Sequence, residues 1–479
     1  MKKLNRAAVE SKSYSNKIIQ FGEGNFLRAF VNWMVHTMNQ QAGFDAGVVV
    51  IQPIEHGLVD MLNEQDGLYT VNLNGIKNGT PMNEYELIDC IQQGINPYSD
   101  YDAYLKLAED PNFRFVVSNT TEAGITYNAN DTLADSPAIS FPAKLTALLH
   151  KRFVHFNGAS DKGFIFLPCE LIDKNGENLK RIILKYANDW QLGDAFVHWI
   201  ENDNVFCNTL VDRIVSGYPK NRIEKIHQTL GYQDNLVVEG EQFHLWVIEG
   251  LGAFEKEIPA EVCGLNIIFT QDLTPYRTRK VRILNGAHTS LVPVGYLYGI
   301  DKVRESVQDP VVGTFIQEAI TENICPTLDF PANELTQFSN DVLDRFRNPF
   351  LDHQLISISL NSVSKYKTRV LPSVLKYIET KNELPKHLLF SLAALVVFYS
   401  GNRNGSRIEL KDDKEVLDFF KNQWEGSDIS AIVKATLSNT AFWEVDLTSY
   451  PGVLEFVQNK TTDIVTLGMK KALENFLKS

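Results

Sequence analysis

A lysine, an asparagine and a histidine stand close together in the stretch Lys280–His288, which reads KVRILNGAH. If this stretch is helical, at about 100° per residue Asn285 lies roughly 140° and His288 roughly 80° around the axis from Lys280, so the three share one face. Desolvation and neighbouring positive charges favour the neutral amine of a lysine, which can then exchange a proton with a substrate. We therefore predict that Lys280, Asn285 and His288 are catalytic. The alternative is a solvated basic segment, because other cations stand beside Lys280, namely Arg277, Arg279 and Arg282.

A second candidate is a glycine-containing turn that follows a strand-like apolar run. The turn Gly22-Glu23-Gly24 ends the run Lys17–Phe21 and precedes a helical pattern. Glycine suits such a turn because it adopts positive φ and, lacking a Cβ, lets the backbone approach a pyrophosphate at a helix N-terminus. Leu27 occupies the position of the third glycine in the usual dinucleotide fingerprint. An ordinary strand-to-helix turn is therefore an equal alternative.

The other residues predicted to contact a dinucleotide follow two further strand-like runs. After Gly47–Ile51 the usual acidic residue is missing, and Gln52 is the candidate for a ribose hydroxyl, with Glu55 a little further on. Thr121 and Glu122 follow a third run, at the end of a strand where an α/β sheet binds its ligand, or they cap a helix. The full predicted cofactor-binding set is Ile19, Gln20, Phe21, Gly22, Glu23, Gly24, Asn25, Phe26, Leu27, Arg28, Gln52, Thr121 and Glu122.

The candidate residues lie on two kinds of predicted secondary structure, one in each half of the chain. In the first half of the chain, short β-branched or aromatic runs alternate with helical patterns such as Phe26–Met38, which predicts an α/β domain with a parallel sheet. The strand-like runs are Lys17–Phe21, Gly47–Ile51, Phe113–Val117 and Gly163–Leu167. Beyond about residue 270 helical patterns dominate, among them Pro310–Ile324, Leu384–Tyr399 and Thr461–Leu477. We predict two domains, residues 1–268 and 269–479, the second mostly helical.

Composition and charge narrow the classes of partner. The chain of 479 residues carries 46 basic and 59 acidic side chains, a net charge of −13, so its average field repels nucleic acid and anionic membranes. Its longest nearly apolar run, Leu388–Tyr399, is shorter than the roughly 20 residues of a membrane span. The basic N-terminal stretch lacks the apolar segment of a secretory signal, and the five cysteines form no C-x-x-C pair. We expect a cytoplasmic protein with reduced thiols and no metal, and the sequence does not indicate an oligomeric state.

Four longer continuous sequence segments, here called words, carry a resemblance to a known protein family. They are IIQFGEGNFLRAF (Ile18–Phe30), SNTTEAGI (Ser118–Ile125), PCELIDKNG (Pro168–Gly176) and KVRILNGAHTSLVP (Lys280–Pro293). In this order, over nearly the whole chain, they resemble the polyol-specific long-chain dehydrogenases, the mannitol dehydrogenase family. The resemblance implies a Rossmann-type N-terminal domain, a helical C-terminal domain and NAD(H) as cofactor, without a metal.

The resemblance also assigns roles to single residues. The catalytic lysine of the family falls on Lys280, its carbonyl-polarising asparagine on Asn285 and its substrate-binding histidine on His288. It further implies substrate contacts from Asp212 and Lys365.

Two positions depart from the family pattern. Cys169-Glu170-Leu171 stands where mannitol dehydrogenases have a Cys-Asp-Asn-like word, so a second oxyanion asparagine is either lost or supplied by Asn175. Ser357 stands where the family has a polyol-contacting arginine. Mannitol itself is therefore not the expected substrate.

The activity that the resemblance implies is the reversible, NADH-dependent reduction of D-tagaturonate to D-altronate in galacturonate catabolism. The arginines beside Lys280 are predicted to attract the substrate carboxylate. One alternative is a reductase for fructuronate or for another hexuronate or polyol, since epimers differ only in the placement of hydroxyl groups. Another is a protein that senses a dinucleotide or a sugar acid without turnover.

Overall fold

The computed structural model describes residues 1–77, 79–121, 123–250, 252–426 and 428–479. The chain forms two compact units. The first consists of Met1–Asn74 and Met82–Leu273, and the second of Gly75–Pro81 and Thr274–Ser479. The segment Gly75–Pro81, which includes the end of a β-hairpin, thus groups with the second unit although its flanking chain belongs to the first.

Within the described residues, the first unit is built on a parallel sheet with the strand order β6-β3-β2-β7-β8-β9. The strands are β2 (Asn16–Phe21), β3 (Gly47–Ile51), β6 (Ile91–Ile95), β7 (Phe115–Ser118), β8 (Ile165–Pro168) and β9 (Val205–Phe206). In chain order of these strands this is 3-2-1-4-5-6, the order of a Rossmann fold, and it reverses direction between β2 and β7. The predicted α/β class and its parallel sheet are therefore confirmed.

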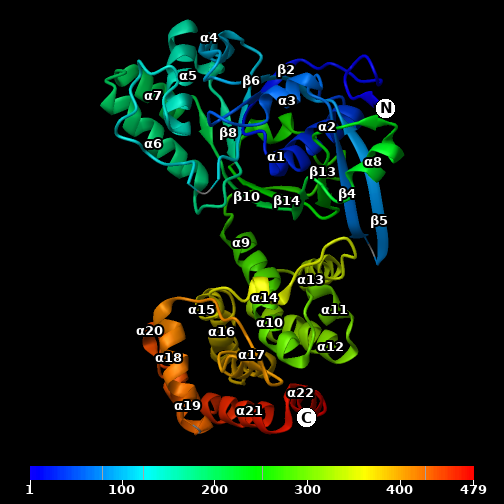
Figure 1. Ribbon diagram of the computed structural model, residues 1–479. Helices are drawn as coiled ribbons and strands as arrows, with labels where there is room; N and C mark the ends of the chain where they lie inside the picture. The colour runs from blue at the N-terminus through cyan, green and yellow to red at the C-terminus, as the bar shows by residue number, and fades with distance from the viewer. Residues whose placement is uncertain (78, 122, 251, 427) are drawn as a thin grey trace. The chain divides into compact units, whose positions relative to one another are not determined.

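Successive residues of these strands belong to two separate cores. Ile18 packs in one hydrophobic cluster and its neighbour Ile19 in the other, because side chains of a strand alternate between the faces of a sheet. Val48 and Val49 divide in the same way. Helix α2 (Val31–Ala42) covers the first face, whereas α5 (Phe141–His155) and α6 (Asn175–Asp189) cover the second (Figure 1). Burial on both faces explains why the strands read as continuous apolar runs.

The helical pattern after the first glycine turn is interrupted. It forms α1 (Asn25–Ala29) and α2, which meet at Phe30, a residue with φ −118° and ψ −79°. The other helices of the unit are α3 (Val59–Glu64), α4 (Tyr101–Lys106), α7 (Asp194–Asn202) and α8 (Ile223–Leu230). One smaller sheet consists of β10 (Asn208–Asp212), β14 (Leu245–Glu249) and β15 (Ile267–Thr270). Another consists of β11 (Val215–Gly217), β13 (Val238–Glu241), β4 (Tyr69–Lys77) and β5 (Thr80–Ile88), and β1 (Lys2–Lys3) pairs with β12 (Tyr232–Gln233).

The second unit is mostly helical, as predicted. Its helices are α9 (Thr274–Lys280), α10 (Gly286–Tyr298), α11 (Val303–Gln308), α12 (Pro310–Glu318), α13 (Ala332–Phe346), α14 (Leu355–Ile358), α15 (Ser362–Arg369), α16 (Leu371–Lys381), α17 (Lys386–Phe398), α18 (Lys414–Trp424), α19 (Ile429–Leu437), α20 (Thr440–Trp443), α21 (Val453–Leu467) and α22 (Met469–Phe476). A short hairpin joins β16 (Asn402–Arg403) and β17 (Ser406–Arg407). Helix α17 contains most of the longest apolar run and is buried in this unit, so that run is a core helix. Among the described residues, no helix is both long and apolar enough to cross a lipid bilayer.

Two predicted helices of this unit are divided. Thr461–Leu477 is split between α21 and α22, because Gly468 between them has φ 79°, outside the helical region. Pro310–Ile324 begins as α12, where Asp309 accepts hydrogen bonds from the N–H groups of Val311 and Val312. It continues as a π-helical segment over Ala319–Ile324.

Candidate active site

The carboxyl ends of β2 and β7 lie side by side where the strand order reverses, the place where an open α/β sheet binds its ligand. Gly22 follows β2 with φ +116°, a conformation that L side chains rarely adopt. A Cβ there would lie 2.9 Å from the main-chain oxygen of Asn119, which follows β7. The turn therefore requires glycine for conformation and for space. This crevice is the candidate dinucleotide site of the first unit.

The predicted segment Ile19–Arg28 divides into buried and accessible residues. Ile19, Gln20 and Phe21 belong to β2 and are fully buried. Gly24 and Asn25, at the first turn of α1, are exposed, and a Cβ on Gly24 would meet nothing within 4 Å. The accessible part of the segment is therefore its turn and the start of α1, including the half-buried Phe26. Leu27 is buried, with Cδ1 3.3 Å from where a Gly22 Cβ would be.

The side chains of Glu23 and Arg28 form hydrogen bonds that hold this turn in place. The Arg28 guanidinium is buried and donates to the Glu23 main-chain oxygen (3.1 Å), to Asn25 Oδ1 (2.8 Å) and to the Leu236 main-chain oxygen. Burial lowers the pKa of Arg28 and raises that of Glu23. The Glu23 carboxylate accepts from the Leu58 N–H (3.2 Å), which ties the glycine turn to the loop after β3.

Gln52 stands at the end of β3 and is buried, with its amide engaged by the following loop. Its Nε2 donates to the main-chain oxygens of Ile54 and Glu55, both at 2.9 Å, and its Oε1 accepts from the Val59 N–H at 3.3 Å. The Glu55 side chain is exposed on the same loop. Gln52 thus shapes the loop beside the crevice, and its predicted contact with a ribose hydroxyl stays a prediction.

The loop after β7 is fixed by a carboxylate whose importance sequence reasoning missed. Glu170, 2% exposed after β8, accepts hydrogen bonds from Ser118 Oγ (3.0 Å) and from the N–H and Oγ1 of Thr120 (both 2.9 Å). Burial raises the pKa of Glu170. Thr121, which follows Thr120 in the loop after β7, is exposed with φ 74°. The signal in the sequence was an acidic residue two positions after the end of a buried strand. The predicted Glu122 lies outside the described residues.

Asn175 and Asp212, both predicted to bind substrate, are buried near this edge of the first unit. Asn175 begins α6, and its Nδ2 donates to the main-chain oxygens of Pro168 (2.9 Å), Glu170 (3.1 Å) and Thr209 (3.2 Å). Its Oδ1 accepts from the N–H groups of Gly176 (2.9 Å) and Thr209 (2.8 Å). These bonds engage both donors and the acceptor of the amide, so Asn175 joins β8, β10 and α6. Asp212 is the last residue of β10. Their predicted substrate contacts stay predictions.

The second unit carries its own group of candidate residues, built around a π-helical segment. The helix α9 ends at Lys280, the π segment covers Val281–Asn285, and α10 begins at Gly286. In a π-helix residue i bonds to residue i+5, so a spacing of five brings side chains onto neighbouring turns, whereas in an α-helix it separates them by about 140°. The regular helix assumed from the sequence was wrong here. The π segment brings Asn285 closer to the face of Lys280, and such segments are frequent at functional sites.

The predicted catalytic residues are all half-buried in the second unit. Asn285 has no hydrogen-bond partner for its side chain among the described residues. The His288 ring stacks on Phe346, with centroids 4.1 Å apart, and meets the edge of His353 at 5.4 Å. The amide of Asn285 is therefore available to a ligand, and His288 is held in place by aromatic packing.

Cations gather around His288. Burial, followed by the charges of His353, Arg345, Arg369 and Lys365, holds the pKa of His288 well below its usual value of 6.5. The imidazole is therefore neutral near pH 7 and can both donate and accept a hydrogen bond. The predicted substrate-binding Lys365 donates to the Ile358 main-chain oxygen at 2.7 Å.

The arginines beside Lys280 have different surroundings. Arg279 is buried, lies 3.5 Å from the Glu334 carboxylate and stands over the rings of Tyr276, Phe330 and Phe338, with centroids 4.6–5.3 Å away. It is therefore a structural residue of α9. Within the described chain, Nε of Arg279 and Nη1 of Arg282 are both buried without a hydrogen-bond partner, but Arg282 lacks the ion pair and the ring contacts of Arg279, and burial lowers its pKa to about 10.

Comparison with known proteins identifies the family. A model described as the mannitol dehydrogenase Rossmann domain matches residues 16–261, and one described as the mannitol dehydrogenase C-terminal domain matches residues 272–465. The chain belongs to the mannitol dehydrogenase family. The membership predicted from the four sequence words is thus confirmed.

Relatives within the mannitol dehydrogenase family match over the full chain. Altronate oxidoreductase of Pectobacterium carotovorum is 46% identical over 99% of this chain and 100% of its own length. The proteins of the same name from Yersinia enterocolitica and Escherichia coli O139:H28 are 47% and 46% identical, over 99% of both chains. Among solved structures, a substrate-free D-sorbitol dehydrogenase has a TM-score of 0.81 at 21% identity, covering 98% of this chain and 100% of its own. Mannitol 2-dehydrogenase of Pseudomonas fluorescens, a ternary complex with NAD and D-mannitol, has a TM-score of 0.64 at 21% identity and full coverage of both chains. The two structures share the fold.

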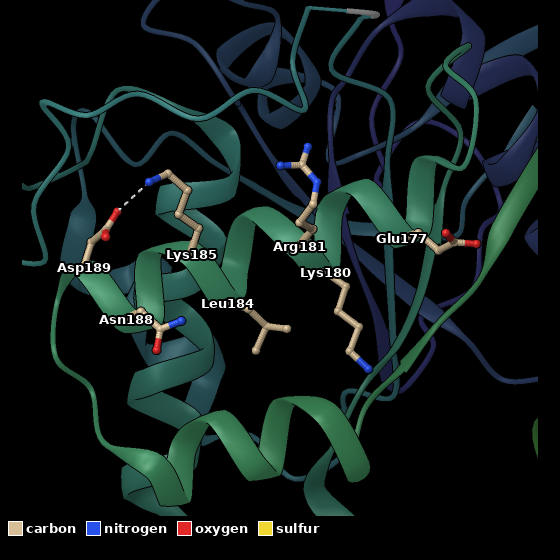
Figure 2. A pocket seen from close by; sticks show the side chains of 7 residues that line it. All are labelled: Glu177, Lys180, Arg181, Leu184, Lys185, Asn188 and Asp189. Atoms are coloured by element: carbon tan, nitrogen blue, oxygen red, sulfur yellow. Dashed lines mark hydrogen bonds and ion pairs between the residues drawn. The ribbon is translucent and has the colours of Figure 1, made fainter.

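The first unit of this mannitol dehydrogenase family member also carries a surface pocket. A depression of about 510 Å³ lies along the exposed side of α6, lined by side chains from Glu177 to Asp189 (Figure 2). Its lining includes none of the predicted site residues. In the described part of the chain, no group of three or more His, Cys, Asp or Glu side chains is placed to hold a metal ion.

Proposed function

We propose that this protein reduces D-tagaturonate to D-altronate with NADH and catalyses the reverse oxidation with NAD⁺. The observation that carries the proposal is the 46–47% identity to three bacterial altronate oxidoreductases over 99% of the chain. The match includes both units, and therefore both the crevice beside Gly22 and the π segment after Lys280. The partner in this proposal is a small sugar acid.

The residues at the β2–β7 crevice fit a dinucleotide. Gly24 leaves room for close approach of a pyrophosphate, because a Cβ there would meet nothing within 4 Å, whereas Gly22 provides the positive φ of the tight turn. When bound, NADH supplies the hydride that adds to the ketone carbon. NADH is preferred over NADPH because the loop after β3 carries no lysine or arginine between Gln52 and Val59, while Glu55 is exposed there and would repel a 2′-phosphate.

The side chains around the π segment supply the proton chemistry. Lys280 Nζ donates a proton to the alkoxide oxygen during reduction, and its neutral amine removes that proton during oxidation. The Asn285 amide donates a hydrogen bond to the same oxygen as negative charge develops on it. The neutral His288 orients a neighbouring hydroxyl, since one ring nitrogen donates and the other accepts.

The test is NADH oxidation followed at 340 nm with D-tagaturonate, D-fructuronate and D-fructose as substrates, and with NADPH in a parallel series. We expect the highest kcat/KM for D-tagaturonate with NADH. A higher kcat/KM for D-fructuronate or D-fructose would assign the enzyme to another substrate. Absence of turnover with every substrate, while NADH still binds, would favour a sensor.

A further inference from the structure

Among the described residues, Arg369 is a cation near Asn285 and His288 that forms no ion pair. Lys365 and Arg369 are four residues apart on α15 and therefore lie on the same side of that helix, one turn apart. The Lys365 amine donates to the Ile358 main-chain oxygen, whereas the half-buried Arg369 guanidinium has no hydrogen bond or ion pair within the described chain. A half-buried charge without a partner is unfavourable, so a ligand anion would stabilise it.

The backbone places Arg369 beside the catalytic segment. A Cβ on Gly286, the residue after Asn285, would lie 3.1 Å from the Arg369 main-chain oxygen. The end of α15 thus packs against the start of α10 just where the π segment ends. The charge of Arg369 also acts on His288, two residues further along α10.

The one described carboxylate whose charge acts on Lys365, that of Asp412, is already engaged in hydrogen bonds. Burial and the charge of Arg369 lower the pKa of Lys365, and the charge of Asp412 acts in the opposite direction. The Asp412 Oδ2 accepts a hydrogen bond from the Tyr399 hydroxyl and another from the Val363 N–H at 3.5 Å. No described acidic side chain contributes to the pKa of Arg369, which burial alone lowers.

We propose that Arg369 binds the carboxylate of the substrate and so makes the enzyme select a sugar acid over a neutral ketose. This inference rests on the proposed function, because it concerns the same substrate. In D-tagaturonate three hydroxylated carbons separate the ketone from the carboxylate, a span comparable to the roughly 5.4 Å of one helical turn. Asn285 would hold the ketone end and Arg369 the carboxylate end. A guanidinium suits the second task because its planar fork can donate two parallel hydrogen bonds to a carboxylate.

The inference differs from the sequence-based expectation that the arginines beside Lys280 attract the carboxylate. Arg279 is occupied by Glu334 and by aromatic rings. Arg282 remains a competitor, since its Nη1 is buried without a partner, but no described contact places its guanidinium beside His288. Variants of both Arg369 and Arg282 are therefore compared in the experiment.

The experiment measures kcat and KM with NADH for D-tagaturonate and for D-tagatose, which carries CH₂OH in place of the carboxylate. The variants are Arg369→Met, Arg369→Lys and Arg282→Met. Lys367→Met is the matched control, because Lys367 lies on the same helix and pairs with the exposed Glu444 at 3.0 Å. We expect Arg369→Met to raise KM for D-tagaturonate about 10- to 100-fold, the effect of one lost charge-assisted pair, with D-tagatose kinetics unchanged within about 3-fold. Arg369→Lys keeps the charge and should lose less, and Lys367→Met should leave both substrates unchanged.

Each other outcome has a definite meaning. Equal losses for both substrates, or an acid-specific loss in Arg282→Met and not in Arg369→Met, would overturn the assignment to Arg369. If Arg369→Met does not fold, as judged by circular dichroism, Arg369→Lys decides, and an unchanged KM for D-tagaturonate in that variant overturns the bidentate contact. A wild-type enzyme that reduces D-tagatose as efficiently as D-tagaturonate would overturn the proposed function itself, before any variant is compared.

Discussion

The two glycines of the first turn have separable roles, and replacing each by alanine should give different results. At Gly22, φ +116° strains any L residue by about 1–3 kcal/mol. The added Cβ also lies 2.9 Å from the Asn119 main-chain oxygen, so the ends of β2 and β7 must shift apart. We expect Gly22→Ala to lower the free energy of unfolding by about 2–4 kcal/mol and to weaken NADH binding through distortion of the crevice.

Gly24→Ala is the matched control for that destabilisation. Gly24 has φ −65° and ψ 167°, which alanine adopts readily, and its Cβ would meet no atom within 4 Å. Stability should therefore stay within about 0.5 kcal/mol of the wild type. If the dinucleotide approaches here, however, the methyl group enters the space of the cofactor, and the Kd for NADH should rise about tenfold or more, which corresponds to a loss of about 1.4 kcal/mol.

Urea unfolding followed by circular dichroism gives the stabilities, and quenching of tryptophan fluorescence gives the Kd for NADH. The reasoning would be refuted by a Gly24→Ala protein that is as unstable as Gly22→Ala. An unchanged Kd for NADH in Gly24→Ala would refute the placement of the dinucleotide at this turn. A fully stable Gly22→Ala protein would show that the strands accommodate the methyl group.

Three further outcomes follow from the site. Lys280→Ala should lower kcat about 10²- to 10⁴-fold with an unchanged Kd for NADH, while Lys367→Ala keeps full activity; a turnover near that of the wild type would remove the catalytic role of Lys280. Because the folded state holds the pKa of His288 well below 6.5, the unfolded chain takes up a proton there first, so stability should fall as pH drops below about 6.5, by at most about 1.4 kcal/mol per pH unit. His288→Gln should make this decline shallower, and an identical decline in urea unfolding series from pH 7 to 5 would contradict the burial argument. Activity should survive exhaustive chelation with EDTA, and a loss that a divalent ion restores would show metal-dependent chemistry.

The sequence by itself determined the architecture and the family. Short, continuous apolar runs between turns predicted the central strands, because a strand that is buried on both faces of a sheet needs apolar residues at every position and not only at alternate ones. The glycine at position 22 was also visible in the sequence, since the turn after the first strand of such a sheet needs a residue without a Cβ. Four words of sequence then sufficed to recognise the mannitol dehydrogenase family.

Only the tertiary structure decided which of these side chains are available to a ligand. Gln52 and Asn175 look like ligand-binding amides in the sequence, yet main-chain groups engage both donors and the acceptor of each. The π segment before Gly286 changes the angular positions of Asn285 and His288, and a regular helical period does not reveal it. Arg369 comes to Gly286 from a helix more than 80 positions later in the chain. The physical reason is the same in each case: hydrogen-bond partners and charge neighbours are supplied by segments distant in sequence, whereas a local pattern records only which face of an element is apolar.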